Sequence, residues 1–557
     1  MNKKLIVLLL CASLAGCGQA KPSGNSSSSA IENTSSSSSQ EEQYNIVRPT
    51  YNPEYNNYSV SAAPSGVNMT YYSDIYSRGF SWLTDESVTD TKLYLVQSDK
   101  GEQADFSSAQ AIDGSVGEIT YEKNGDFAMT EDANSISYPH KSGDNSSNDY
   151  VLKANSHKVH VENLEKGKAY SYKLGSEQGW YYGAFIVEKD APKELTAVHM
   201  SDAQTKDPSK LNVWRNTFTK AVTTAGDKLD TVLYNGDQFD QNISKVNSSD
   251  QYKPNRLLSY AKAYDIIQDY KFNLPYMSAA GNHERTAPYS HYIMSDIDYD
   301  GYDYAGSYYS YDYNFAHFVV LNTKSVTDDE VTWLQQDLAA SNAKWKIVMM
   351  HISPYSTGDN SNSSENQNIV KKFTPIFSAN HVDLVLQAHD HTYNKTLPYK
   401  WDAAGYTTTW NNEEVVNFTP ETETKDNIVY DKNPEGTYYV TTGAAGHRSG
   451  GAESDGIWAD VTKDGDSWKG VNSSKTFLSN NYKIECGKLK YDNHYDAQSG
   501  DKYTCTTDYH VGDLATGNVN AQMFGVLNLS ETTLNYNVYT VNNDTVKLFD
   551  SVDVLKA

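Results

Sequence analysis

Five short apolar runs in this chain each end in polar side chains that can bind a metal ion, and this pattern constrains the fold most. The runs are rich in Val, Ile, Leu and Tyr and are separated by helical patterns, which is typical of parallel strands buried on both faces. Open α/β sheets place ligands just beyond the carboxyl ends of their strands, so one site can collect all of these side chains. In chain order, the residues are Asp202, Asp237, Asn282 with His283, His351, and His389 with His391.

The types and order of these residues indicate a site for two metal ions. Asp237 follows a strand in the tight turn Asn235-Gly236-Asp237, where its carboxylate can be shared between two ions. Two ions about 3.5–4 Å apart bind phosphoryl oxygens and lower the pKa of a bridging water, which overcomes the repulsion between an anionic substrate and an anionic nucleophile. The other ligands that we predict are Asn282, His351 and His389 for one ion, and Asp202 and His391 for the other.

The motifs around these residues resemble those of the calcineurin-like metallophosphoesterase family. They are SDAQ (201–204), GDQFD (236–240), GNHER (281–285), MMHISPY (349–355) and AHDHTY (388–393). The resemblance implies hydrolysis of phosphate monoesters, as by acid phosphatases, through attack of a hydroxide bound at a dinuclear centre of Mn, Fe or Zn ions. It also implies a small phosphorylated substrate.

Two departures from the family pattern affect the ion for which Asp202 and His391 are the predicted ligands. Family members carry a His two residues after the first Asp, or a Tyr three residues after the second, where this chain has Gln204 and Asp240. Without the tyrosine, no tyrosinate-to-iron colour is expected. We expect Gln204 or water to complete the shell of the ion held by Asp202, Asp237 and His391, and this ion to bind weakly.

The resemblance also assigns residues around the metals. His283 is expected to lie over the leaving-group oxygen, where it can donate a proton, with Glu284 orienting its ring. His447 and Arg448, in the glycine-rich stretch GAAGHRSG, can reach the phosphate in one interpretation and are ordinary loop residues in the other. His199 is expected to pack beneath the site.

After residue 190 the sequence alternates between strand and helix patterns. Asp207-Pro208 offers an N-cap followed by proline, and apolar residues recur at helical spacing from Leu211 to Val222. Thr327 and Glu330 form a capping box ahead of another helix. Alternating segments at 520–557 predict strands that complete a second, antiparallel sheet. Residues 191–557 are therefore predicted to form a two-sheet α/β domain with αββα (or α/β/α) layers, with a polar insertion at about 452–518.

Residues 47–190 contain many short alternating segments rich in aromatic and β-branched residues, which predict an all-β sandwich. The stretch HVENLEKGKAYSYKLG (160–175) resembles the fibronectin type III-like domain that precedes the catalytic domain in purple acid phosphatases. This places the chain nearest that branch of the family, with Trp82 as the core tryptophan of the sandwich. Any other sandwich fold is the alternative.

Residues 1–17 are predicted to be an export signal, because two lysines precede an apolar stretch too short to span a bilayer. Leu14-Ala15-Gly16-Cys17 resembles the lipobox of bacterial lipoproteins, and an ordinary secretory signal is the alternative. The resemblance implies a lipidated Cys17 that anchors the exported chain to the cell membrane or outer membrane, facing the periplasm or exterior. The Ser-rich residues 18–46 are predicted to be a disordered tether.

Charge and cysteine content narrow the function further. The formal net charge of -25 disfavours a nucleic acid polymer as partner. The chain has only four cysteines, which argues against a thiolate metal site. Cys486 and Cys505 are predicted to form a disulfide in an oxidising compartment. No oligomeric state follows from the sequence.

Two other functions compete with the phosphatase. A phosphodiesterase or nucleotide hydrolase uses the same metal pair, with its specificity set by loops. A non-catalytic surface-binding protein with a degenerate site fits the tether, the 44 tyrosines and the two altered metal positions. The retention of Asp237, both members of the Asn282-His283 pair, His351, His389 and His391 argues against a degenerate site.

Overall fold

In the computed structural model, the chain from Tyr44 to Ala557 forms one compact unit. The structure describes residues 44–55, 60–122, 151–205, 208–239, 256–284, 289, 292, 308–355, 364–391, 393–396, 398–401, 414–417, 420–446, 461–464, 467–470, 482–485, 488–491 and 521–557. The predictions for Cys17, Asp240, His447, Arg448, Cys486 and Cys505 fall outside these residues, as does the predicted signal segment.

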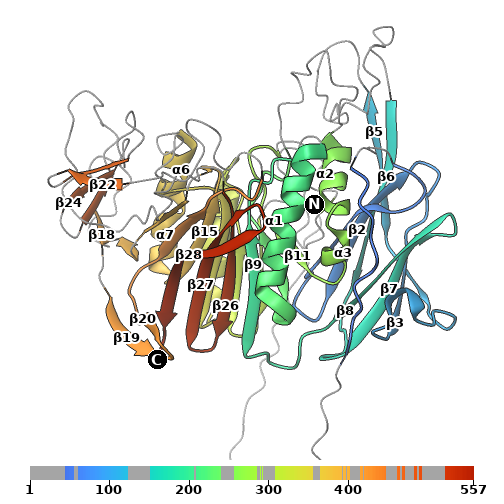
Figure 1. Cartoon of the computed structure of the whole chain (residues 1–557), viewed down its shortest axis with the longest axis horizontal. Coiled ribbons are helices and arrows are strands. Elements are labelled where there is room, and N and C mark those ends of the chain that lie inside the picture. The colour runs from blue at the N-terminus through green and yellow to red at the C-terminus, as the bar shows by residue number, and fades with distance from the viewer. Residues whose placement is uncertain are drawn as a thin grey trace, which may run out of the picture. The chain divides into compact units, whose positions relative to one another are not determined.

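Two four-stranded antiparallel sheets form the N-terminal part of this unit (Figure 1). One is β1 (Ser65–Thr70), β2 (Arg78–Asp85), β6 (Val151–Val161) and β5 (Ser115–Glu122), and the other is β4 (Ala111–Asp113), β3 (Lys92–Gln97), β7 (Ala169–Ser176) and β8 (Gly179–Ile186). Phe80, Trp82 and Leu174 belong to the buried cluster that both sheets share. Trp82 is fully buried and stacks on His157 at a centroid distance of 5.1 Å, which confirms its predicted core position. A closer likeness to a fibronectin type III domain stays a prediction.

Two mixed sheets follow, and they pack face to face. The larger has the order β11 (Tyr276–Ser278), β10 (Thr231–Tyr234), β9 (Glu194–Met200), β26 (Gln522–Ser530), β27 (Thr533–Asn542), β28 (Thr545–Leu555), β20 (Ile428–Lys432) and β19 (Glu421–Lys425). The smaller has the order β12 (Tyr309–Tyr313), β13 (Ala316–Val320), β14 (Trp345–Ile352), β15 (Leu384–Ala388), β21 (Tyr438–Thr442) and β16 (Tyr393–Lys395). Side chains from both sheets, such as Leu195, Leu386 and Val538, fill the layer between them.

The last three strands differ from the prediction that they complete a second, antiparallel sheet. β26 pairs antiparallel with β9, so β26, β27 and β28 extend the sheet that already contains β9, β10 and β11. The physical reason is that β9 is the edge of that parallel group and offers an unpaired row of backbone groups. The second sheet is built instead from the middle of the chain.

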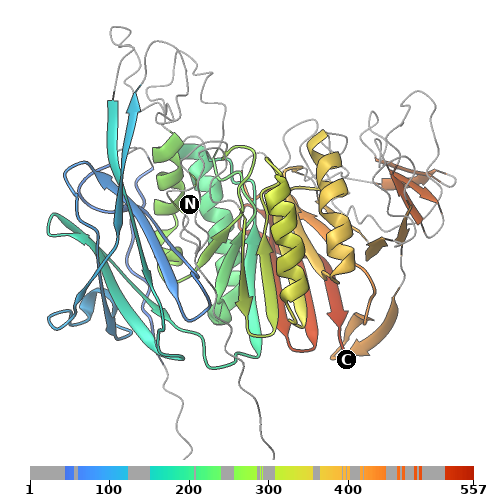
Figure 2. The same ribbon diagram turned by 180° about the vertical axis from the view of Figure 1, so that it is seen from behind.

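Helices cover the outer faces of the two sheets (Figures 1 and 2). α1 (Pro208–Ala225), α2 (Arg256–Asp265) and α3 (Gln268–Lys271) lie on the larger sheet, and α5 (Asp328–Ala340), α6 (Ser364–Lys372) and α7 (Thr374–Ala379) lie on the smaller. The predicted αββα layering is therefore present. Two short 3-10 helices, η1 (Gly101–Gln103) and η2 (Gly226–Lys228), complete the helical elements of the described residues. None of the described helices combines the length and apolar character that crossing a membrane requires.

Further strands lie in and beside the predicted insertion at about 452–518. β17 (Tyr399–Trp401), β18 (Glu414–Asn417), β25 (Lys488–Tyr491) and β24 (Tyr482–Glu485) form one sheet, and β22 (Val461–Asp464) pairs with β23 (Ser467–Gly470). β18 precedes the insertion and pairs with β25 inside it. The bounds of the insertion stay a prediction.

Two helices begin where the sequence predicts them. On α1, the Trp214 and Phe218 side chains are fully buried against the larger sheet. At the start of α5, the Thr327 hydroxyl accepts a hydrogen bond from the Glu330 backbone N–H at 3.1 Å, as in a capping box. The Glu330 carboxylate also accepts the backbone N–H of Asn322 at 2.7 Å, which joins α5 to the end of β13.

A histidine on β13 links the edge strand β12 to α5, and it makes stability depend on pH. His317 Nδ1 lies 2.7 Å from an Asp312 oxygen and Nε2 lies 2.8 Å from an Asp337 oxygen. Burial lowers the pKa of His317, but its hydrogen bonds to these two carboxylates outweigh burial and raise the pKa to about 9, above the usual 6.5. The stabilisation is therefore fully present below pH 6.5 and is lost as the pH rises through about 9.

We expect His317→Gln to lower the thermal unfolding midpoint in acidic and neutral solution and to have a shrinking effect between pH 6.5 and about 9. The measurement is the difference in midpoint between the parent and the variant across this range. A difference that stays constant up to and beyond pH 9 contradicts the expectation.

Candidate metal centre

The predicted metal ligands all lie where parallel strands of the two sheets end. Asp202, Asp237 and Asn282 follow β9, β10 and β11 of the larger sheet, which run parallel. His351 is near the end of β14, and His389 and His391 follow β15, which runs parallel to β14 in the smaller sheet. The two sheets therefore bring the six residues to one rim, as the sequence predicts.

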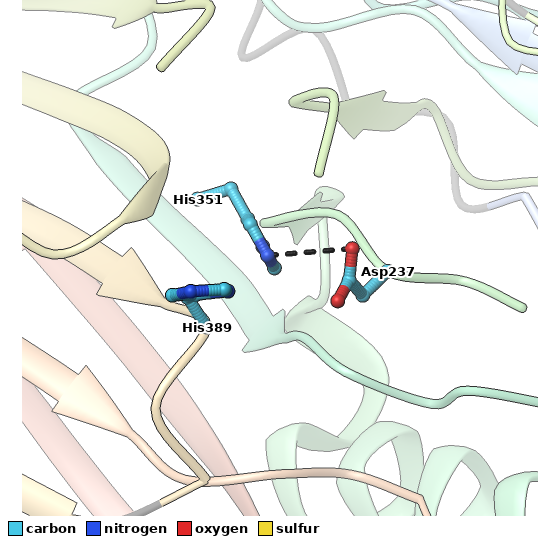
Figure 3. Close-up of side chains that lie close together, drawn as sticks. All are labelled: Asp237, His351 and His389. Atoms are coloured by element: carbon cyan, nitrogen blue, oxygen red, sulfur yellow. Dashed lines mark ion pairs between the residues drawn. The ribbon is translucent and has the colours of Figure 1, made fainter. Parts of the chain in front are cut away.

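Asp237 faces His351 at this rim (Figure 3). His351 Nε2 is 3.3 Å from one Asp237 oxygen and 2.9 Å from the Asn282 side-chain oxygen. His283 Nε2 is 3.6 Å from the other Asp237 oxygen. The donor atoms of Asp237, His351 and His389 all lie within 4.8 Å of one another, and Figure 3 shows these three side chains close together, from separate segments. This arrangement fits one metal ion.

The ligands predicted for the other ion also meet. His391 Nε2 lies 3.3 Å from one oxygen of Asp202, and the backbone N–H of His389 donates to the other oxygen at 3.3 Å. The loops of Asp202 and Asp237 are joined by a hydrogen bond from the Asp202 N–H to the Gly236 carbonyl at 3.0 Å. The two predicted ligand sets are therefore neighbours.

Gln204 lies between the two sets and is almost completely buried. Its amide nitrogen donates to an Asp237 oxygen at 3.2 Å. Its side-chain oxygen is buried and has no hydrogen-bond partner among the described residues. Leaving a buried polar atom unsatisfied costs about 1–3 kcal/mol, so this oxygen fits a metal ligand better than a structural role.

Four of the predicted ligands have a left-handed backbone conformation. Asp202, Gln204, Asp237 and His389 have φ angles of 52°, 42°, 55° and 73°, in the left-handed region that costs a non-glycine residue roughly 1–2 kcal/mol. Such residues persist where the surrounding structure fixes them, and they cluster at functional sites. Strain at four predicted ligands therefore supports a binding role for this rim.

Gly281 makes the close approach of two loops possible. A Cβ atom at this position would lie 2.2 Å from an Asp237 oxygen and 2.5 Å from the Asp237 backbone nitrogen. Any larger side chain would push the loop after β11 away from the loop after β10. The glycine of the GNHER motif therefore keeps Asn282 and His283 next to Asp237.

Glu284 has a different role from the predicted one. It was expected to orient the His283 ring, but among the described residues its carboxylate accepts the backbone N–H groups of Gly281, Asp237 and Gln238, at 2.6, 2.7 and 2.7 Å. His283 faces Asp237 instead. Glu284 therefore joins the loops after β10 and β11. The sequence motif gives no sign of this, because the bonds depend on backbone groups that only the folded chain brings together.

Asp237 and His351 shift each other's pKa in opposite directions. Burial raises the pKa of Asp237, but His283 and His351 outweigh burial and hold it well below its usual range. Burial lowers the pKa of His351, but Asp237 outweighs burial and raises it to about 10. His351 Nδ1 lies 2.6 Å from the Asn235 carbonyl oxygen, which can only accept, so Nδ1 carries a proton and Nε2 faces the site. Metal binding at Nε2 releases the other proton, so affinity falls in acid.

Several supporting residues were not predicted. The Tyr234 hydroxyl accepts the Ala203 N–H at 2.9 Å, and the Tyr276 hydroxyl donates to the Gln238 side chain at 2.8 Å. Both tyrosines are fully buried beneath the loops that carry Asp202 and Asp237. His199 is also buried beneath the site, with Nδ1 2.6 Å from the Tyr536 hydroxyl, in agreement with its predicted packing role.

Comparison with known proteins agrees with this geometry. A family model described as calcineurin-like phosphoesterase matches residues 195–393, a span that starts in β9 and includes every predicted ligand from Asp202 to His391. Residues 195–393 are a calcineurin-like phosphoesterase domain. The β14–β15 rim of this phosphoesterase domain thus carries the histidines predicted as ligands, and the β9–β11 rim carries the predicted carboxylates and amide.

Relatives of the phosphoesterase domain include acid phosphatases. Acid phosphatase type 7 of Mus musculus and that of Homo sapiens are each 26% identical to this chain over 315 residues, which cover 52% of this chain. The alignment spans 64% of the length of each of these relatives. Purple acid phosphatase 18 of Arabidopsis thaliana is 26% identical over 148 residues, which cover 24% of this chain and 33% of the relative.

A solved structure shares the fold. The purple acid phosphatase PPD1 from yellow lupin (Lupinus luteus) seeds matches with a TM-score of 0.54 at 14% identity, covering 89% of this chain and 74% of that chain. The structural match therefore covers far more of the chain than residues 195–393, which the family model matches. The chain therefore has a purple acid phosphatase-like fold.

Proposed function

We propose that this chain is a metal-dependent phosphatase that hydrolyses phosphate monoesters, like the acid phosphatases that it resembles. The observation that carries the proposal is the convergence on Asp237 of side chains from both sheets, with His351 Nε2 at 3.3 Å and His283 Nε2 at 3.6 Å. A degenerate site, as in a non-catalytic surface protein, would have no reason to keep strained ligand conformations at four positions.

The residues present fit a pair of metal ions, for which Asp202, Asp237, Asn282, His351, His389, His391 and Gln204 would be the ligands. When bound, such ions would neutralise the phosphoryl charge and supply an activated water. His283 is a non-ligand side chain beside Asp237, and it is 8% exposed. Its backbone N–H donates to Asp237 at 2.8 Å, which fixes its position. His283 can therefore donate a proton to the leaving-group oxygen of a bound monoester.

The test is hydrolysis of 4-nitrophenyl phosphate and bis(4-nitrophenyl) phosphate by the full chain with added manganese, zinc or iron. We expect faster hydrolysis of the monoester, loss of activity with a chelator, and recovery with metal. Preference for the diester would support the phosphodiesterase alternative. Hydrolysis of neither ester by protein that contains bound metal would support the non-catalytic alternative.

We predict that Gln204 shifts the metal preference. An oxygen-rich shell favours harder ions such as manganese or magnesium, whereas nitrogen and phenolate donors favour zinc and iron. We expect a colourless protein whose weaker site is refilled best by manganese. Gln204→His should retain more metal after dialysis, because an imidazole can replace the amide oxygen beside Asp237, and Gln204→Ala should retain less.

Metal content and activity of the three forms after dialysis are the measurements. A purple protein with a tightly held ferric ion would contradict the expected metal preference. A Gln204→His form that holds no more metal than the parent would contradict the role of Gln204 as a ligand.

We also propose that the chain is exported and held at a membrane surface by a lipid on Cys17. The lipobox-like residues 14–17 and the Ser-rich segment after them support this proposal. We expect Cys17→Ser to release the protein from the membrane fraction or to leave its precursor unprocessed. Cell fractionation and the mass of the mature chain are the measurements. Normal processing with unchanged membrane association would rule out lipidation of Cys17.

A further inference from the structure

The N-terminal sandwich contacts the phosphoesterase domain through an irregular point in β1. The pairing of β1 with β2 shifts register between Ser65 and Asn68, and Gly66 has a φ of 61°. A Cβ atom on Gly66 would lie 2.7 Å from the Tyr292 ring and 3.0 Å from the Ala261 backbone. Such bulges re-aim side chains and are common next to active sites. Here the bulge brings the β1 backbone against the segment that follows the GNHER motif.

Buried hydrogen bonds fix this junction. The Gly66 N–H donates to an Asp265 carboxylate oxygen at 2.6 Å. The Val67 carbonyl accepts from the Gln268 amide at 2.7 Å and from the Lys271 side-chain nitrogen at 2.8 Å. The Lys271 side chain is buried, so this hydrogen bond is shielded from water and is costly to break. The sandwich is therefore held rigidly against α2 and α3.

Asn68 joins the sandwich to Tyr292, which follows His283 in the chain. It is 1% exposed, and its amide nitrogen donates to the backbone carbonyl of Tyr292 at 2.6 Å. Tyr292 is fully buried and stacks on Tyr260 at a centroid distance of 4.6 Å. Tyr289 donates its hydroxyl proton to the Ser278 carbonyl at the end of β11. Both tyrosines belong to the segment that follows His283.

A continuous series of buried aromatic contacts joins Tyr292 to the loops after β10 and β11. Tyr292 packs edge-on to Tyr264 at 5.5 Å, and Tyr264 packs edge-on to Tyr276 at 5.2 Å. The Tyr276 hydroxyl bonds to the Gln238 side chain at 2.8 Å, and the Gln238 N–H bonds to Glu284 at 2.7 Å. The loop after β10 therefore holds Glu284, next to His283, and the sandwich holds Tyr292.

We propose that the sandwich is part of the catalytic unit and that Asn68 is a positioning residue, which sets how His283 meets the leaving group. The inference rests on the proposed phosphatase function. Among the described residues, Asn68 has no contact with the predicted metal ligands or with His283. It acts through its hydrogen bond to the carbonyl of Tyr292. Its removal should therefore change leaving-group chemistry more than metal binding.

Asn155 provides a matched control. It is 3% exposed, and its amide nitrogen donates to the Val88 carbonyl at 2.7 Å, so it makes the same kind of bond as Asn68. Both partners of this bond lie within the sandwich. Asn155→Ala should lower the thermal stability of the full chain to a similar extent as Asn68→Ala, without an effect on leaving-group chemistry.

The test compares kcat and KM for 4-nitrophenyl phosphate and phenyl phosphate in the parent, Asn68→Ala and Asn155→Ala. A general acid raises the rate about 10²–10⁴-fold, mostly for poor leaving groups. A displaced acid loses part of this rate enhancement. We therefore expect Asn68→Ala to lower kcat about tenfold more for phenyl phosphate than for 4-nitrophenyl phosphate. Metal content should stay at the parent level. Hydrogen exchange should speed up in the peptide that contains Tyr292 in Asn68→Ala and not in Asn155→Ala.

Equal effects on both esters, or the same kinetics in Asn68→Ala and Asn155→Ala, would overturn the inference while the parent remains an active phosphatase. A parent that hydrolyses neither ester with metal bound would overturn the proposed function and the inference with it. If Asn68→Ala does not fold, Asn68→Asp keeps the size of the side chain, replaces the donor by an acceptor, and should give the same difference between the two esters.

Discussion

Asp237→Asn is expected to abolish most of the phosphatase activity and most of the metal binding. Asp237 is 1% exposed, faces His283 and His351, and accepts a hydrogen bond from Gln204, so it contacts members of both predicted ligand sets. The amide keeps the shape and removes the charge that two neighbouring cations need. Removing a residue that only orients a metal ligand costs about 10–100-fold in metal affinity or activity. We therefore expect Asp237→Asn to lower kcat more than about a hundredfold.

The measurements are the metal content of the purified variant and its kcat with saturating metal. Asp269→Asn is the control, because Asp269 is also buried and pairs with Arg215 at 2.6 Å, on the outer side of the larger sheet. This control should lower stability and leave metal content unchanged. Near-normal activity of Asp237→Asn with two ions retained would contradict the two-metal site.

Glu284→Gln is expected to weaken metal binding about 10–100-fold, although Glu284 is not a predicted ligand. Its carboxylate accepts three backbone N–H groups, from Gly281, Asp237 and Gln238. A carboxamide has only one accepting oxygen and turns its NH₂ group toward at least one of these donors. The loops after β10 and β11 should then separate, and Asp237 and Asn282 with them. Metal titration of the apoprotein gives the affinity.

Glu330→Gln separates this effect from the general cost of changing a buried glutamate. Glu330 is fully buried and accepts the backbone N–H of Asn322, far along the chain from the metal loops. Glu330→Gln should therefore destabilise the protein without changing its metal affinity. If Glu284→Gln binds metal as tightly as the parent, Glu284 does not hold the loops in their ligand positions.

The sequence predicts the positions of these side chains well because the signals for them are local. Each of Asp202, Asp237, His351 and His389 stands at the end of an apolar run, and the strand pattern alone places it at the rim. Helix starts such as Thr327 are predicted for the same reason, since a cap involves residues three apart.

Features that depend on distant pairing were not predicted. The C-terminal strands join β9, with Gly525 opposite His199, and no local pattern distinguishes this edge from a new sheet. The role of Glu284 depends on N–H groups from an earlier loop, such as that of Gln238, which is 46 residues earlier in the chain. The contact of Asn68 with Tyr292 spans 224 residues. Such contacts follow from packing of the layers, which the sequence pattern does not specify.

The division of the predicted ligands between two sheets affects how sensitive each molecule is to proteases before it binds metal. Asp202, Asp237 and Asn282 come from the larger sheet, whereas His351, His389 and His391 come from the smaller, and no backbone ladder joins these sheets within the described residues. An ion shared by both groups would cross-link two layers that meet through side chains and at a few backbone bonds, such as that from the Ala445 N–H to the Ser201 carbonyl at 2.9 Å. If the chain is exported before it binds metal, as proposed above, it would be most protease-sensitive until it takes up metal, because metal binding stabilises the folded state by mass action. The supply of metal outside the membrane would then set how much of the protein survives.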